Sequence, residues 1–215
     1  MEIIPGILER EWSEIERKLE LVRPFAKSVH IDIVDGVFFD NKTFLDPKPF
    51  KKYEQDFLLE VHMMVDNPLQ YLKPWAEAGF QRFLGHIEKM PDPVEFVAQG
   101  QLLGAVGLAI DGPTSLDVLN DLNLNDLDCL LIMAIKAGRA GQGFQPDLLE
   151  KVREIKKSHS YLPIEVDGGI NSETIKLAAE SGASRFVCNS HLFQAENISD
   201  KFEELSSLVR EGTPS

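Results

Sequence analysis

The sequence predicts a single (β/α)₈ barrel, a TIM barrel, that spans residues 1–215. Apolar runs of strand length alternate with segments of helical periodicity eight times along the chain. Most connections between them are only a few residues long, which is typical of parallel α/β folds. Three of the expected strands end in histidine or aspartate, and barrel enzymes carry their functional side chains at the carboxyl ends of their strands.

The expected strands are short and apolar. They cover residues 2–8, 28–34, 57–64, 82–87, 105–110, 128–135, 162–167 and 184–188. In the second strand, alternation places His30 and Asp32 on one face and only apolar side chains on the other. Such a polar face suits the inside of a parallel barrel, where residues near the strand end line a site.

The first helices are marked by periodicity and by proline. Residues 11–22 carry apolar side chains at helical spacing, and Pro24 stops that helix. A proline-rich loop follows the second strand, so no helix is expected before Phe50. Asn67 and Pro68 are expected to open the next helix as its N-cap and first residue, and that helix runs through residue 78.

The later helices show similar start signals. Asp92 precedes a proline at the start of one helix, and Asn171 or Ser172 is expected to cap another. Pro113 is expected to open a short helix after the fifth strand. The remaining expected helices cover residues 92–100, 145–158, 171–181 and 198–210.

The composition limits the possible partners. The chain has 215 residues, of which 43% are hydrophobic, enough for one substantial core. A net charge of −13 without a long basic run makes nucleic acid and anionic membranes poor partners. A phosphorylated small molecule remains possible, because backbone amides at helix N-termini bind phosphate.

Two further features concern location and redox state. Cys129 and Cys188 lie in apolar runs and are expected to be buried thiols and not a disulfide. Neither a secretion signal nor an apolar run of membrane-spanning length is apparent, so we expect a cytoplasmic protein.

Four side chains at strand ends form a candidate metal site. His30, Asp32, His62 and Asp167 offer two imidazoles and two carboxylates, a set that divalent metals accept. Taken singly, each residue is more often a structural group or a cap. Their joint appearance at strand ends favours one divalent ion, and the residue types leave Zn²⁺, Fe²⁺, Mn²⁺ and Co²⁺ open.

Several motifs resemble the ribulose-phosphate 3-epimerase family. They are residues 30–41 (HIDIVDGVFFDN), 61–68 (VHMMVDNP), 86–88 (HIE), 133–144 (MAIKAGRAGQGF) and 165–170 (EVDGGI), in family order. The resemblance runs from Ile4 to about Phe193, and the first two motifs together with VDGG are specific. It implies a barrel of the ribulose-phosphate-binding type with a sugar phosphate as its partner. We also expect a homo-oligomer.

The resemblance implies an isomerase of the pentose phosphate pathway. Such an enzyme inverts C3 of D-ribulose 5-phosphate to give D-xylulose 5-phosphate. In the family, one divalent metal is held by the residues that match His30, Asp32, His62 and Asp167, and the two aspartates are also catalytic. One aspartate removes a proton, the other returns one to the opposite face, and the metal stabilises the enediolate between them.

Substrate contacts are expected mainly in the loops after the last three strands. Gly168 and Gly169 let the backbone approach a phosphate closely, and Met64 and Met133 match family residues that wall the substrate's path. Arg139 adds a cation that could close on a phosphate. The expected substrate and phosphate contacts are Met64, Met133, Gly138, Arg139, Gly168, Gly169, Asn189 and Ser190.

The chain departs from the family at substrate contacts and not at the metal set. Gly6 stands where the family has a serine, and Val34 where it has a methionine. Asn189 replaces a glycine, and residues 137–142 differ from the family's loop. A related ketose phosphate, such as allulose 6-phosphate, therefore stays open as the substrate.

Two other functions compete with epimerisation. The decarboxylase and aldolase branch of phosphate-binding barrels uses an Asp-x-Lys pair on strand two, but residues 31–34 contain no lysine. A barrel that only binds sugar phosphates is the other possibility. The intact histidine and aspartate set argues against it, and the altered loop at residues 137–142 argues mildly for it.

Overall fold

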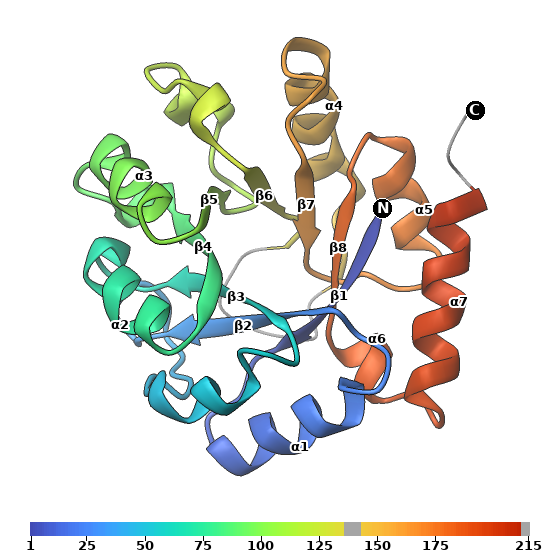
Figure 1. Cartoon of the computed structure of the whole chain (residues 1–215). Helices are drawn as coiled ribbons and strands as arrows, with labels where there is room; N and C mark the ends of the chain where they lie inside the picture. Colours follow the sequence, from blue (N-terminus) through green and yellow to red (C-terminus); the bar gives the residue numbers. More distant parts are fainter. Residues whose placement is uncertain (136–142, 212–215) are drawn as a thin grey trace.

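In the computed structural model, which describes residues 1–135 and 143–211, eight parallel strands close into one barrel (Figure 1). Each strand pairs with the next along the chain, and the last pairs with the first. The strands are β1 (Glu2–Ile7), β2 (Ser28–Val34), β3 (Leu58–Met64), β4 (Phe80–His86), β5 (Ala105–Ile110), β6 (Cys129–Met133), β7 (Ile164–Asp167) and β8 (Arg185–Cys188). The expected barrel is therefore confirmed.

Helices surround the barrel on its outside (Figure 1). The α-helices are α1 (Trp12–Val22), α2 (Leu72–Glu77), α3 (Pro93–Gln101), α4 (Leu149–Ser158), α5 (Thr174–Glu180), α6 (Ser190–Phe193) and α7 (Ile198–Glu211). Short 3₁₀ turns are η1 (Lys48–Tyr53), η2 (Pro68–Tyr71), η3 (Ile87–Lys89), η4 (Leu116–Leu119), η5 (Leu124–Asp126) and η6 (Pro146–Leu148). Across the described residues, no helix combines the length and the apolar character that crossing a membrane requires.

Two helix starts follow the expected capping chemistry. The Asp92 side chain accepts a hydrogen bond from the Glu95 amide at 2.9 Å, which satisfies a free donor of the first turn of α3. Asn171, two residues before the N-cap position Glu173 of α5, accepts from the amides of Glu173 and Thr174 at 2.8 and 3.0 Å. The Asp92 cap was predicted from the residue type, and of the two alternatives Asn171 and Ser172 it is Asn171 that bonds the amides at the start of α5.

Of two other predicted helix starts, the one at Asn67 and Pro68 is right in position but not in capping or in helix type, and the one at Pro113 is wrong. Asn67 has a left-handed backbone with φ of 49° and makes no side-chain cap, and Pro68 opens η2 instead of an α-helix. The left-handed backbone turns the side chain of Asn67 away from the capping geometry, while the Asn67 amide donates to the Lys89 carbonyl at 3.2 Å. Pro113 does not open a helix; instead the Ser115 side chain accepts from the Asp117 amide and caps η4, and Asn123 caps η5 in the same way.

The core has an outer and an inner apolar cluster. Val29, Ile31 and Ile33 of β2 point outward into the larger cluster between barrel and helices. The inner cluster fills the barrel beneath its mouth and consists of Val34, Met64, Leu84, Ala109, Cys129, Leu131, Met133 and Ile135. Cys129 and Cys188 are buried free thiols, as predicted. His30 and Asp32, on the inward face of β2, are left to carry chemistry inside the barrel.

Candidate functional site

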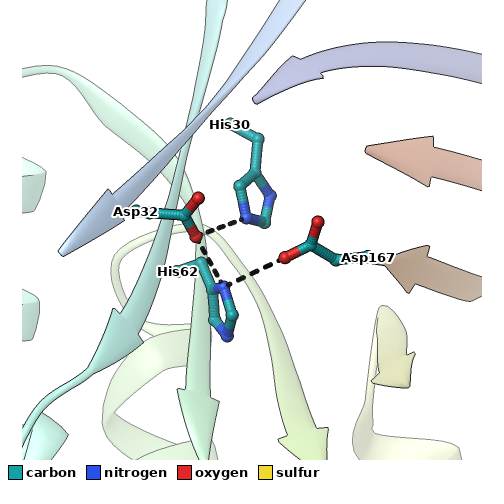
Figure 2. Close-up of side chains that lie close together, drawn as sticks. All are labelled: His30, Asp32, His62 and Asp167. Atoms are coloured by element: carbon teal, nitrogen blue, oxygen red, sulfur yellow. Dashed lines mark hydrogen bonds and ion pairs between the residues drawn. The ribbon is translucent and has the colours of Figure 1, made fainter. Parts of the chain in front are cut away.

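Four side chains from three strands converge inside the carboxyl end of the barrel (Figure 2). β2 supplies His30 and Asp32, β3 supplies His62, and β7 supplies Asp167. Asp32 and His62 are direct neighbours in the pairing of β2 with β3, so both point inward together. One ligand atom from each of the four residues lies within 4.8 Å of the others.

The distances within this group are those of donors that face a common point. Asp32 Oδ1 lies 3.2 Å from His30 Nε2 and 2.8 Å from His62 Nδ1. Asp167 Oδ2 lies 4.0 Å from the same His62 nitrogen (Figure 2). The two histidines are fully buried, and the Asp167 side chain is 14% exposed. Two imidazole nitrogens and two carboxylate oxygens fit a divalent cation in donor type and in charge.

Electrostatics make the two aspartates unequal. Burial alone raises the pKa of Asp32, but hydrogen bonds and charge from His30 and His62 outweigh it and hold that pKa well below its usual range. Burial, together with the charge of Asp32, raises the pKa of Asp167 to about 7. Burial lowers the pKa of His62 to about 4. One carboxylate of the site therefore favours the ionised form and the other the protonated form.

A buried charged layer lies behind His30. Its Nδ1 is 2.6 Å from Glu60 Oε1 and 3.2 Å from Glu165 Oε1. Arg82 donates to the second oxygen of Glu60 at 2.6 Å. With Nδ1 directed at carboxylates, the other ring nitrogen of His30 is left to face the site.

No role was predicted for Glu60, Arg82 or Glu165, although Glu165 begins the motif at residues 165–170. A signal was available for the two glutamates, because each lies two residues before a site residue on the same strand and so on the same inward face. Glu60 precedes His62, and Glu165 precedes Asp167. With His30 they form a second group of possible metal ligands, in which Arg82 already supplies positive charge.

The turn after β7 requires glycine. Gly168 and Gly169 have φ of 108° and 69°, in the region that side chains disfavour. A Cβ on Gly168 would lie 2.5 Å from Ile135, and one on Gly169 would lie 2.9 Å from Phe144. Asn189 follows β8, and Ser190 begins α6. Because β7 and β8 are parallel neighbours, these two connections emerge at the same end of the barrel as Asp167.

Of the other expected substrate contacts, the two methionines lie within the described residues, and the two residues of the loop after β6 do not. Met64 and Met133 are each 2% exposed and belong to the inner apolar cluster, with Leu8 and Phe39 packed against that cluster. Met64 lies two residues beyond His62 on β3, and Met133 is the direct neighbour of Asp167, so both belong to the wall of the barrel mouth. Gly138 and Arg139 lie outside the described residues.

Gly6 stands where the family has a serine, and the surrounding structure leaves no room for a side chain at this position. A Cβ at this position would lie 2.5 Å from a methyl carbon of Val187, which is buried on the paired strand β8. A side chain at residue 6 therefore conflicts with a branched residue at position 187. The two residues are matched to one another.

Known proteins resemble this chain in sequence and in fold. The model of the Ribulose-phosphate 3 epimerase family matches residues 2–193. The cytoplasmic isoform of ribulose-phosphate 3-epimerase from Oryza sativa subsp. japonica is 33% identical over 214 residues, which cover 96% of this chain and 93% of that protein. The ribulose-phosphate 3-epimerase of Mycobacterium leprae is 34% identical over 203 residues, which cover 92% of this chain and 90% of that protein.

Solved structures with low sequence identity have the same fold. The 3-hexulose-6-phosphate synthase of Salmonella typhimurium superposes with a TM-score of 0.73 at 16% identity and covers 99% of this chain and 100% of its own. KGPDC from Streptococcus mutans in complex with D-R5P gives a TM-score of 0.76 at 11% identity, with 99% of each chain covered. At this identity, these structures support the barrel architecture alone.

Restoring a serine at residue 6 should destabilise the protein. In Gly6→Ser, the new side chain collides with Val187, and overpacking of this kind costs roughly 1–3 kcal/mol of unfolding free energy. The free energy is measured by urea denaturation. Val187→Ala in the same background should recover part of the loss, because it removes the colliding methyl. Equal stability of Gly6→Ser and wild type would contradict the steric account.

Proposed function

Because the chain belongs to the ribulose-phosphate 3-epimerase family, whose members are isomerases that act on carbohydrates, we propose that it converts D-ribulose 5-phosphate to D-xylulose 5-phosphate. The observation that carries this proposal is the convergence of two aspartates and two histidines at the barrel mouth. The rice relative is named as a cytoplasmic isoform, and we extend this location to the present chain.

The reaction needs two acid/base groups on different sides of one carbon. Asp32 on β2 and Asp167 on β7 come from well-separated strands, and both project into the same buried space (Figure 2). In our proposal, one carboxylate removes the proton from C3 and the other returns a proton to the opposite face. The roles exchange in the reverse direction. Asp32 is buried and the Asp167 side chain is only 14% exposed, which limits the access of bulk water that would otherwise quench the enediolate between the two proton transfers.

The proposed cofactor is one divalent ion, Zn²⁺, Fe²⁺, Mn²⁺ or Co²⁺. His30, Asp32, His62 and Asp167 would hold it, since their donor atoms face one another and their charge balances a dication. When bound, such an ion supplies Lewis-acid stabilisation of the negative charge that develops on the substrate oxygens. The protein contributes the fixed orientation of the four donors and their shielding from solvent.

The proposed phosphate site lies in the connections after β7 and β8. The glycines 168 and 169 keep the backbone bare, so its amides can approach a phosphate as close hydrogen-bond donors. Asn189 and Ser190 would add contacts from the neighbouring connection. Gly138, Arg139, Met64 and Met133 are proposed substrate contacts on the sequence resemblance. Together these residues would place the phosphate away from the aspartates, which leaves C3 for the acid/base pair.

Loss of either aspartate should stop catalysis. In Asp32→Asn and Asp167→Asn, the amide cannot take up the substrate proton, and removal of one acid/base group costs on the order of 10² to 10⁴ in rate. We expect loss of epimerisation and of solvent deuterium exchange at C3, followed by coupled assay and by NMR. Asp121→Asn, at an exposed position, is the matched control and should retain wild-type turnover. Deuterium exchange at the wild-type rate in either active-site variant would rule out the two-aspartate scheme.

Metal removal should abolish turnover reversibly. Dialysis against a chelator should reduce the rate to background, because the charge on the substrate oxygens would lose its counter-ion. Addition of Zn²⁺, Fe²⁺, Mn²⁺ or Co²⁺ should restore it, and the ion that restores it at the lowest concentration identifies the preferred metal. Full activity after chelation, with metal content checked by atomic spectroscopy, would exclude a metal-dependent epimerase. Sugar-phosphate binding without turnover under every metal condition would favour a binding protein.

A comparison of substrates should favour the pentose phosphate. We expect kcat/KM to be higher for ribulose 5-phosphate than for allulose 6-phosphate, the alternative that Gly6 and the altered loop keep open. Steady-state assays with both ketose phosphates measure the ratio. A ratio that favours the hexulose phosphate would keep the epimerase chemistry and replace its substrate.

A further inference from the structure

His62 is the inner end of a buried hydrogen-bonded chain that leads away from the site. Its Nε2 lies 2.9 Å from Nε2 of His86, at the end of β4. Nδ1 of His86 lies 3.0 Å from Glu88 Oε2 in η3. The other oxygen of Glu88 accepts from the Asp111 amide at 2.8 Å. The site is thereby linked to the connection after β5.

The middle member of this chain is shielded from water. His86 is fully buried, and its ring stacks on that of His62 with centroids 4.9 Å apart. Phe38 and Phe39, in the loop after β2, meet the His86 ring edge to face at 5.2 and 6.1 Å. Both nitrogens of His86 already have a protein partner, so each proton in the chain must sit between two named groups.

The direction of the chain can be worked out from its outer end. An ionised carboxylate only accepts hydrogen bonds, so Nδ1 of His86 must carry a proton toward Glu88. Burial alone would raise the pKa of Glu88, but hydrogen bonds from His86 and the Asp111 amide lower it to about 2, which keeps it ionised. When a cation occupies Nδ1 of His62, the proton of that ring lies on Nε2 and is donated to Nε2 of His86, whose own proton on Nδ1 faces Glu88. In the metal-free protein the Asp32 carboxylate competes with this arrangement, because its Oδ1 lies 2.8 Å from Nδ1 of His62 and can only accept a proton from it.

We propose that Glu88, acting through His86, is a positioning residue that holds His62 in the tautomer whose Nδ1 is free to bind a divalent cation. The inference rests on the proposed metal-dependent function and adds to it two residues outside the ligand set. Outer groups that fix the tautomer of a ligating histidine commonly change metal affinity by 10- to 100-fold.

Glu88→Gln tests the proposal because it reverses the donor and acceptor roles along the hydrogen bonds from residue 88 through His86 to His62 and leaves those bonds in place. The Asp111 amide can only donate, so the oxygen of the introduced side-chain amide must face it, and the NH₂ group of that side chain must face His86. His86 then accepts at Nδ1 and donates from Nε2, and the Nδ1 of His62 carries a proton toward Asp32. Every group in the metal-free variant keeps a partner, so the fold should be preserved. Metal binding must first undo this arrangement.

The first measurement is titration of Zn²⁺ into chelator-treated protein by calorimetry. We expect Glu88→Gln to bind 10- to 100-fold more weakly than wild type, with an unchanged melting temperature of the metal-free protein. Glu95→Gln, an exposed glutamate on α3, makes the same charge change as a control and should bind like wild type. Equal affinity of Glu88→Gln and wild type would overturn the positioning role alone. Absence of Zn²⁺ binding by wild type would instead overturn the proposed metal site.

The second measurement locates the proton on the His86 ring directly. Long-range ¹H–¹⁵N NMR on histidine-labelled, metal-free protein reports which nitrogen of His86 carries a proton. We expect a proton on Nδ1 in wild type and on Nε2 in Glu88→Gln. A purely structural role of Glu88 would not move that proton. The same His86 pattern in both proteins would therefore sink the proposal even if Glu88→Gln bound metal poorly.

Discussion

The alternation of side chains along the strands of a closed barrel is the constraint on which the site depends. Every second residue of β2 points outward into the core beneath the helices, and His30 and Asp32 take the inward positions. β2 and β3 pair along their whole length without a bulge, which sets Asp32 beside His62. A slip of one residue would turn both ligands toward the helices and expose apolar side chains to the interior. The same register therefore stabilises the core and assembles the site.

Polar groups inside a barrel must be paired, because water cannot compensate for them there. Below the site, Glu60 satisfies this requirement by accepting from His30 on one oxygen and from Arg82 on the other. Glu165 Oε1 lies 3.2 Å from the same nitrogen of His30, and burial together with the charge of Glu60 raises the pKa of Glu165 to about 8. It is therefore mostly neutral near pH 7, which lowers the cost of a second carboxylate in this space. Orientation of a ligand and pairing of buried charge are thus achieved by the same contacts.

The sequence predicts the barrel well because strand alternation and strand length are local properties. It also indicates the four residues of the site, since histidine and aspartate are unusual at inward positions of apolar strands. The tertiary partners are not local: Arg82 lies on another strand from Glu60, and nothing in the order of residues pairs them. Asn67 stands at the expected N-cap position but does not cap, because its backbone is left-handed, and the order of residues does not reveal that conformation. The side-chain turns at Ser115 and Asn123 are local, but they compete closely with a helix start.

The two histidines of the site are oriented by different routes, and the strand register explains the difference. Glu60 of β3 is the direct neighbour of His30 of β2, so a carboxylate reaches that ring in one step. The neighbour of His62 on β4 is Leu84, which belongs to the inner apolar cluster and offers no acceptor. The acceptor for His62 must therefore come from further along β4, where His86 lies above Leu84 and Glu88 follows in η3. Because Phe38 packs on His86, the loop after β2 is also in contact with this route, and the orientation of one ligand depends on three connections at the mouth of the barrel.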